Sequence, residues 1–407
     1  MPGAPRSGSR RRVSTASGSE RPLAKVPLAT ARGTDPVDAL HFYEKGSSWS
    51  MQIEHNRSSQ AAFDYVEGVK RYIAEKSMPK LRAAYETREH RYAQAHNGEK
   101  PTTMEQVGEL MRPMTLYRYN RAIQQASQGL MWAVIYESLE PRRAELAEEL
   151  NRPTENALGS VETDPDLEPP SYYMAVEFHL QPRSYHGDDL AGVVYDIGAP
   201  IYVLHRNGPD SGESGRALAS VIPPARYEKI LDMGCGVGQK TIPVADAFPC
   251  SEVHAIDLSA PMIKYAHKRA ERMGRRVHFS QQNAERTKFP DESFDLVFST
   301  ILLHELPPVA IQNMIAEIHR LLKPGGLTAH LNLPPYSQMS AYNAFLMNWE
   351  THNNGEPYWH AFHKLDLPAV FRVAGFKNIR EVAAESKNTG RGAYSGQSPY
   401  LVTMAEK

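Results

Sequence analysis

Three glycines stand at alternate positions in LDMGCGVGQK, residues 231–240, directly after an apolar run. Gly234, Gly236 and Gly238 carry no Cβ, so this turn can take φ values that other residues avoid, and its backbone can lie directly against a ligand. Asp232 precedes the glycines at the end of the apolar run. The stretch is therefore a candidate binding site for a nucleotide-like ligand.

The spacing of these residues separates two kinds of nucleotide site. Dinucleotide-binding folds use GxGxxG, with a pyrophosphate on the following helix and an acid about 20 residues further on for the ribose. Here the spacing is GxGxG, and Asp232 suits a ligand with a positive amine or sulfonium better than one with a pyrophosphate. Asp257 ends the next apolar run and can accept hydrogen bonds from both ribose hydroxyls. The combination favours S-adenosylmethionine over NAD as the cofactor.

An alternation of strands and helices must position this loop. Apolar segments at 227–233, 251–257, 275–282, 293–300 and 325–333 predict strands, and segments at 239–248, 260–274, 307–322 and 366–376 predict helices. Strands that alternate with helices of this length pair in parallel, which predicts an α/β fold with a Rossmann-like doubly wound sheet. Such sheets bind ligands at the carboxyl ends of their strands, where the glycine loop would lie. Segments 377–385 and 398–406 predict an antiparallel C-terminal hairpin.

The N-terminal part of the chain has a different pattern. Residues 1–44, rich in Ser, Gly, Pro and Arg, predict a disordered tail, with an organelle transit peptide as the alternative. Residues 45–151 predict a helical domain, because apolar residues recur there at three- and four-residue spacing. Residues 152–170 contain acids and prolines and predict a linker.

Composition limits the classes of partner. The formal net charge is −1, so no global positive field attracts nucleic acid or an anionic membrane surface. No run approaches the roughly 18 consecutive apolar residues that cross a bilayer. The two cysteines form no ligand-like or disulfide pattern, which favours a reducing, cytoplasmic location. We expect a small-molecule or local protein partner, and neither nucleic acid nor membrane.

Four blocks resemble the class I S-adenosylmethionine-dependent methyltransferases, in particular the group that modifies small molecules. They are ILDMGCGVG (230–238), VHAIDLSAPMIKYA (253–266), NAERTKFPDESFDLVFSTILLHEL (283–306) and LLKPGG (321–326). They stand in the order and spacing of that family. The resemblance implies that residues 171–407 form the methyltransferase domain, with lid helices before its first strand.

The resemblance also implies roles for individual residues. The three glycines would lie under the methionyl and ribose portions of the cofactor, and Asp257 would hold the ribose hydroxyls. Residues expected beside the adenine or the methionine are Leu258, Met262, Asn283, Ala284, Ser299 and Thr300. Asn283 departs from the family pattern, which usually has an aspartate there, but its carbonyl can still accept a hydrogen bond from the adenine amino group.

Catalysis needs a base only if the nucleophile starts protonated, since the sulfonium is already a good leaving group and the enzyme mainly aligns the reactants. His304 and Glu305, just past the fourth strand, are the candidate catalytic residues. The family often carries two histidines there, so Glu305 is a departure and is expected to orient His304. A structural histidine followed by a helix-starting acid is the alternative.

Two clusters predict the acceptor pocket. The segment 349–363 is rich in aromatic and amide side chains, which suit a flat, partly polar acceptor, and it supplies the candidates Trp349, Asn353 and Trp359. The segment 171–202 precedes the first strand, where the resembling family places lid helices. Its candidates are Tyr185, His186 and Tyr195, with ordinary packing as the alternative.

No metal site is expected. His352, Glu356, His360 and His363 could be written as a ligand set, but Gly355 and Pro357 interrupt any regular helix and leave the geometry of these residues unconstrained.

The sequence thus predicts a methyltransferase acting on an O, N or C nucleophile of a small organic acceptor of the secondary-metabolite kind. The helical domain would complete the pocket or mediate self-association into a homo-oligomer. Two alternatives remain open: a peptide or protein methyltransferase, and a non-catalytic regulator that binds S-adenosylmethionine. The loop spacing disfavours an NAD-dependent oxidoreductase.

Overall fold

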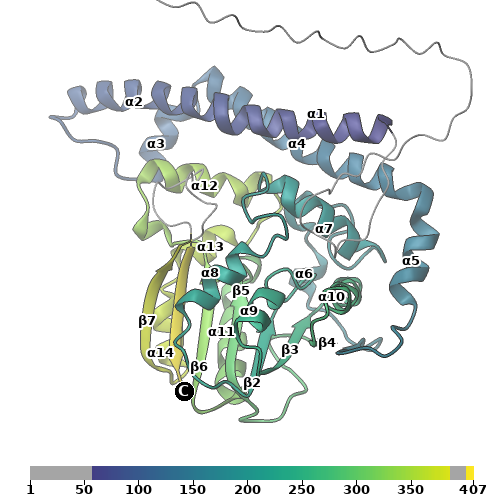
Figure 1. Cartoon of the computed structure of the whole chain (residues 1–407). Coiled ribbons are helices and arrows are strands. Elements are labelled where there is room, and N and C mark those ends of the chain that lie inside the picture. The colour runs from purple at the N-terminus through teal and green to yellow at the C-terminus, as the bar shows by residue number, and fades with distance from the viewer. Residues whose placement is uncertain (1–56, 386–399) are drawn as a thin grey trace, which may run out of the picture. The chain divides into compact units, whose positions relative to one another are not determined.

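An eight-stranded sheet runs through the part of the chain that the computed structural model describes, residues 57–385 and 400–407 (Figure 1). Its strand order is β1-β4-β3-β2-β5-β6-β8-β7. The strands are β1 Ser160–Glu162, β2 Lys229–Met233, β3 Glu252–Asp257, β4 His278–Gln281, β5 Phe294–Thr300, β6 Leu322–Asn332, β7 Lys377–Ala384 and β8 Tyr400–Glu406. β8 is antiparallel to both β6 and β7, and all other neighbouring strands of this sheet pair in parallel. The predicted Rossmann-like sheet with a C-terminal hairpin is confirmed.

Helices cover both faces of this sheet. The helices that alternate with the strands are α8 Glu213–Val221, α9 Thr241–Ala247, α10 Ala260–Arg272, α11 Pro308–Leu321 and α14 Leu367–Val373. Apolar residues of α8, α9 and α10 share one core cluster with the strands, whereas those of α11 and α14 belong to another. The sequence predicts such coverage because parallel strands that are buried on both faces carry continuous apolar runs.

The strand order reverses at β2, which pairs with β3 on one side and with β5 on the other. Such a switch point leaves a crevice outside the carboxyl ends of the two strands. The glycine loop follows β2 at this crevice, and Asp257 ends β3 beside it.

Helices N-terminal to the sheet pack on the sheet-forming part of the chain. They are α1 Arg57–Tyr72, the π-helical turn η1 Ile73–Ser77, α2 Met78–Ala95, α3 Met104–Met111, α4 Thr115–Leu139, the short turn η2 Glu140–Arg142 and α5 Arg143–Asn151. α1, α4 and α5 share a core cluster with residues between Tyr173 and Tyr265. The N-terminal helical region is confirmed, while its status as a separate domain stays a prediction.

The remaining helices lie around the crevice or between these two parts. They are α6 Ser171–Met174, η3 Phe178–Leu180, α7 Ala191–Tyr202, η4 Leu303–Glu305, η5 Tyr336–Gln338, α12 Ala341–Asn353 and α13 Trp359–Lys364. α12 packs against α3, and Tyr342, Phe345 and Leu346 of α12 are buried with apolar residues of α2 and α3.

The segment expected to be a linker contains one element that periodicity did not indicate. β1 pairs in parallel with the edge strand β4. All three of its residues are exposed, so it has no buried face to produce an alternating pattern. The predicted tail at 1–44, and residues 45–56 of the predicted helical domain, lie outside the described residues.

None of the helices in the described ranges combines the length and the apolar character that a bilayer-crossing segment requires.

Candidate functional site

A cavity of about 280 Å³, here called the main cavity, lies at the carboxyl ends of the strands. It gathers residues from the glycine loop, the ends of β3 and β5, the loop after β4, the segment before α7 and the start of α13. The sequence-predicted residues that line it are Tyr185, Tyr195, Gly234, Gly236, Asp257, Leu258, Met262, Asn283, Ala284, Thr300, His304, Glu305 and Trp359. Most of the predicted site is therefore brought to one place.

The glycine loop takes the backbone conformation that its composition suggests. Gly234, Gly236 and Gly238 have φ values of 75°, 52° and 73°. A Cβ built on Gly234 would lie 2.7 Å from Leu302, whereas one built on Gly236 would meet no described heavy atom within 4 Å. Gly236 thus faces open space on the cavity wall, and Gly238 lies behind that wall against Ala266.

Asp257 is anchored by the backbone on both sides of the crevice. Its Oδ2 accepts a hydrogen bond from the amide of Gly236 at 2.9 Å, and its Oδ1 accepts one from the amide of Ser259 at 2.9 Å. Burial raises the pKa of Asp257 to about 6, although these two hydrogen bonds oppose the shift. Each carboxylate oxygen retains a lone pair that can accept from a ligand hydroxyl.

Asp232 lies beneath the loop and does not line the main cavity. Its Oδ2 accepts a hydrogen bond from the Thr241 hydroxyl at 2.7 Å, and its Oδ1 is buried with no hydrogen-bond partner among the described residues. Burial raises the pKa of Asp232 to about 7. The side chain is thus a buried acid with one unused acceptor, placed to support the loop from below.

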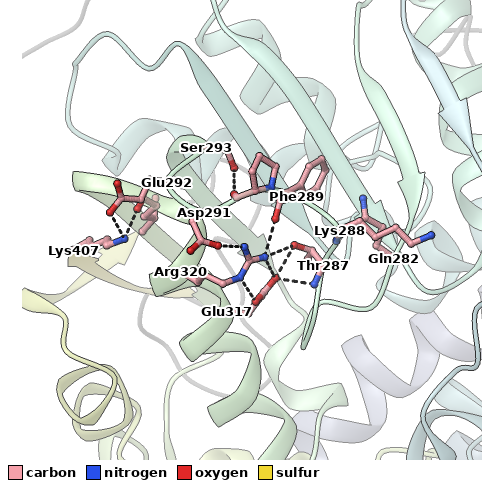
Figure 2. A network of polar contacts seen from close by, with 12 residues as sticks. Gln282, Thr287, Lys288, Phe289, Asp291, Glu292, Ser293, Glu317, Arg320 and Lys407 are labelled. Atoms are coloured by element: carbon pink, nitrogen blue, oxygen red, sulfur yellow. Dashed lines mark hydrogen bonds and ion pairs between the residues drawn. The ribbon is translucent and has the colours of Figure 1, made fainter.

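The loop after β4 forms one side of the cavity and is fixed from outside. Asn283 and Ala284 line the cavity, and Asn283 Oδ1 accepts a hydrogen bond from the amide of Glu285 at 2.9 Å. Figure 2 shows the network that holds this loop to α11. Glu317 Oε1 accepts from both the amide and the hydroxyl of Thr287 at 2.7 Å, and Arg320 donates to the carbonyl of Phe289 at 2.9 Å.

Besides Asp232 and Gly238, four predicted site residues do not line the main cavity. Ser299 is fully buried and its hydroxyl contacts His330 Nδ1 at 2.7 Å, because successive residues of a strand face opposite sides of the sheet and Thr300 takes the cavity side. The His186 ring packs 5.2 Å from that of Tyr173 and does not line the cavity.

Trp349 and Asn353 lie on α12 and are also absent from the cavity wall. The Arg121 guanidinium lies 5.0 Å from the Trp349 ring centroid, and Asn353 Nδ2 donates to the carbonyl of Trp349 at 3.0 Å. The rotation of α12 is set by its packing on α3, so these side chains are turned toward the N-terminal helices or back onto their own helix.

His304 and Glu305 both line the main cavity, but they do not form the expected pair. The buried His304 ring meets Trp359 edge-on at 4.7 Å, and burial together with the neighbouring His179 holds the pKa of His304 well below its usual value. Glu305 instead accepts a hydrogen bond from the Tyr185 hydroxyl at 3.2 Å and lies 3.4 Å from His179 Nε2. The expectation that Glu305 orients His304 is therefore wrong in the described structure, since the carboxylate has other partners.

Sequence reasoning missed several residues of the cavity wall, among them His179, Gln239 and Lys240. Lys240 Nζ donates to Gln239 Oε1 at 2.7 Å, and burial lowers the pKa of Lys240 to about 8. The signal for these two was their position directly after the glycines. His179 had no comparable signal, because its partners are distant in the sequence.

A second cavity, here called the helical chamber, adjoins the main cavity. Its volume is also about 280 Å³, and residues of α1, η1, α4, α7 and α12 line it. The two cavities share the wall residues Tyr202, Val203, Asn207, Leu333, Trp359 and Tyr400. The N-terminal helices therefore contribute to a space that borders the predicted site.

The residues present fit S-adenosylmethionine. Gly236 leaves space that a side chain would fill, Asp257 offers carboxylate oxygens at the end of β3, and Leu258 and Met262 supply an apolar surface for a flat ring. A pyrophosphate would instead place its negative charge beside the Asp257 carboxylate on the same cavity wall.

Across the described residues, no group of three or more His, Cys, Asp or Glu side chains has a geometry that could hold a metal ion. The residues that could be written as a set have separate partners. His360 Nδ1 contacts Asn348 Oδ1 at 2.8 Å, His363 Nδ1 contacts the carbonyl of Pro334 at 2.8 Å, and Glu356 contacts His179 at 2.6 Å.

Comparison with known proteins places the chain among methyltransferases. A family model described as a methyltransferase domain matches residues 230–326. An uncharacterized methyltransferase of Synechocystis sp. is 31% identical over 157 residues, which cover 38% of this chain and 69% of that protein. A demethylmenaquinone methyltransferase of Thermus thermophilus is 32% identical over 108 residues, which cover 26% of this chain and 48% of that protein.

Among solved structures, a methyltransferase of Thermotoga maritima, described as a possible histamine N-methyltransferase, is 19% identical and has a TM-score of 0.38. The match covers 51% of this chain and 92% of that one. Several curated relatives are matched over less than half of their own length.

Proposed function

Because the chain belongs to the class I S-adenosylmethionine-dependent methyltransferases, we propose that it transfers a methyl group to an O, N or C nucleophile of a small organic acceptor. The observation that carries this proposal is the main cavity, in which the bare loop at Gly236 and the carboxylate of Asp257 face the same space as an aromatic wall. S-adenosylmethionine, when bound, supplies an activated methyl group and a sulfide leaving group.

The protein's own residues would bind and orient the cofactor. Asp257 would accept hydrogen bonds from the ribose hydroxyls, and Leu258, Met262 and Ala284 would enclose the adenine. Lys240, which lines the cavity beside the glycine loop, would face the methionine carboxylate. Asp232 would act indirectly by supporting the loop through Thr241.

The acceptor would lie where the main cavity meets the helical chamber. The shared wall carries Tyr202, Trp359 and Tyr400 together with Asn207, a mixture of aromatic surface and single polar groups that suits a small organic molecule. The name of the Thermus thermophilus relative indicates a small-molecule acceptor for that protein, which supports the same class here. The N-terminal helices would then complete the acceptor pocket, and their role in self-association stays a prediction.

We also propose a reducing, cytoplasmic location. Cys235 and Cys250 are free thiols in the described structure, and Cys235 is buried at the glycine loop. Disulfides are typical of proteins in oxidising compartments, and free thiols are typical of proteins in reducing ones, which is the reason for this proposal.

The experiment has two arms. Calorimetry with S-adenosylmethionine, S-adenosylhomocysteine and NAD should show binding of the first two; binding of NAD alone would refute the cofactor. Transfer of labelled methyl should then be measured with a panel of phenols, amines and carboxylic acids, and in parallel with protein extract. Label in small molecules supports the proposal, label in protein supports the peptide methyltransferase, and cofactor binding without transfer to either supports the regulator.

A further inference from the structure

A histidine between two carboxylates stands on the wall of the main cavity. His179 Nδ1 lies 2.6 Å from Glu356 Oε1, and His179 Nε2 lies 3.4 Å from Glu305 Oε1. Glu305 and His179 line the cavity, whereas Glu356 lies behind them with a fully buried side chain. We call these three residues the acid–histidine array. They are 126 and 51 residues apart along the chain, so only the fold brings them together.

The backbone around His179 is built to hold this geometry. His179 itself has a φ of 55°, a left-handed conformation that is costly for a residue with a side chain. Its carbonyl accepts hydrogen bonds from Trp132 Nε1 at 2.8 Å and from Gln128 Nε2 at 3.0 Å, both on α4. Strain of this kind persists only where the surroundings fix it, and it is frequent at functional sites.

The second carboxylate reaches the histidine because of one glycine. Gly355 precedes Glu356 and packs against the segment that carries His179: a Cβ at Gly355 would lie 2.2 Å from the carbonyl oxygen of Glu177. Its φ is 68°. The turn therefore requires glycine both for its conformation and for its close approach, and this approach delivers Glu356 to His179.

The charges favour an imidazolium between the two acids. Burial alone would lower the pKa of His179, but Glu356 and Glu305 outweigh it and hold that pKa above its usual value. Burial raises the pKa of Glu356. Among the described residues, the other titratable groups that face the array come from several elements and loops: Tyr173, Tyr185, Tyr195, Tyr202, Lys240, Asp257, His304 and Glu350.

We propose that His179 is a positioning residue, which holds Glu305 as the proton acceptor for an acceptor molecule whose nucleophile is an O–H or N–H group. Glu305 receives the proton of that group as the bond from oxygen or nitrogen to the methyl carbon forms. The bond between that carbon and sulfur breaks at the same time, and its electron pair stays on sulfur. The Tyr185 hydroxyl donates a hydrogen bond to the same Glu305 oxygen, Oε1, that His179 contacts. This inference rests on the proposed function and narrows its acceptor class.

The test uses the full-length protein with the panel compound that gives the highest turnover. His179→Gln should reduce kcat by about 100-fold, the loss that a misplacement of about 1 Å in a reacting group can cause, with unchanged affinity for S-adenosylmethionine. The basic limb of the wild-type pH–rate profile, where the His179 ring loses its proton, should be absent from this variant because Gln carries no titratable ring. In the wild type, Glu356 and Glu305 raise the pKa of that ring against the effect of burial. Glu356→Gln, which is isosteric, should also lower kcat and should move the basic limb of the pH–rate profile to lower pH. If His179→Gln does not fold, the result with Glu356→Gln tests the proposed role of His179.

His267→Gln is the matched control, since His267 is a buried histidine on α10 that does not line either cavity. It should leave kcat and the pH profile unchanged. The NMR signals of His179 supply a readout without an acceptor: the ring should stay protonated at neutral pH with S-adenosylhomocysteine bound, and it should lose this protonation in Glu356→Gln.

The inference is overturned if the Gln variants keep the wild-type kcat, if they lose kcat equally at every pH, or if the His179 ring is neutral in the wild type. Failure of the wild type to methylate any panel compound would instead count against the proposed function, because the NMR result is independent of turnover.

Discussion

Asp257 is a half-buried side chain that carries both the binding and the pH dependence proposed for the site. Its carboxylate ends β3, faces the main cavity and already accepts two backbone hydrogen bonds. Burial raises its pKa to about 6, so the side chain is ionised at neutral pH and becomes protonated as the pH falls through that value. Only the ionised form can accept from both ribose hydroxyls.

We therefore expect cofactor affinity to be constant at neutral pH and to fall below about pH 6 by about tenfold per pH unit, the limit for one competing proton. Asp257→Asn should weaken binding by about 1.5–3 kcal/mol at neutral pH, the range for a lost hydrogen bond to a charged group, and should abolish the acidic decline. Calorimetry across this pH range measures both effects. Asp291→Asn, at an exposed site in the loop between β4 and β5, is the control. An acidic decline that persists in Asp257→Asn would contradict the assignment.

In the loop between β2 and α9, glycine is needed for two separate reasons: the backbone takes positive φ values, and the cofactor is proposed to occupy space that a side chain would fill. All three of its glycines have positive φ, but only Gly236 both lines the cavity and leaves room for an added Cβ. A methyl group there would strain the backbone and also occupy the space proposed for the cofactor.

Gly274 allows these two effects to be separated. It ends α10 with a φ of 67°, and an added Cβ would likewise meet no described heavy atom within 4 Å, but Gly274 does not line the main cavity. Gly236→Ala and Gly274→Ala should each lower the free energy of unfolding by about 1–2 kcal/mol, the cost of the left-handed conformation. Only Gly236→Ala should also weaken cofactor binding. Thermal unfolding and calorimetry distinguish the outcomes, and equal affinities in the two variants would place the cofactor elsewhere.

Across the whole molecule, the N-terminal helices are part of the core and also border the site. Trp132 of α4 packs so closely on α7 that a Cβ at Gly198 would lie 2.3 Å from its ring. Trp132 also lines the main cavity, and residues of η1 and α4 line the helical chamber. A change in these helices can therefore alter acceptor binding although the cofactor loop lies in a different part of the chain.

Filling the helical chamber should separate acceptor binding from cofactor binding. Ala74, on η1, lines the chamber, so a larger side chain there would take up part of its volume. Ala74→Phe should raise the KM for the panel acceptor about tenfold or more, as expected when a pocket loses the volume of several methylenes. Affinity for S-adenosylmethionine should be unchanged. Glu75→Phe, at the exposed neighbouring position, is the control; an unchanged KM in Ala74→Phe would show that the acceptor does not enter the chamber.

The sequence by itself determined the features that depend on neighbours along the chain. The order of strands and helices follows from runs of apolar residues, and the glycine loop with Asp232 and Asp257 follows from residues adjacent to strand ends. These features are local because backbone conformation and the side of a strand or helix are set within a few residues.

Only the tertiary structure decided which side chains meet across the cavity. Ser299 and Thr300 are neighbouring hydroxyl residues at the end of β5, and the sequence does not show which of them faces the cavity. In the folded sheet only Thr300 lies on the cavity side. Trp349 and Asn353 are turned away from the main cavity because α12 rotates to pack on α3. The acid–histidine array joins Glu305, Glu356 and His179 from three segments through a close approach at Gly355. Contacts between distant segments depend on how whole helices and strands pack against one another, and local sequence patterns do not predict this packing.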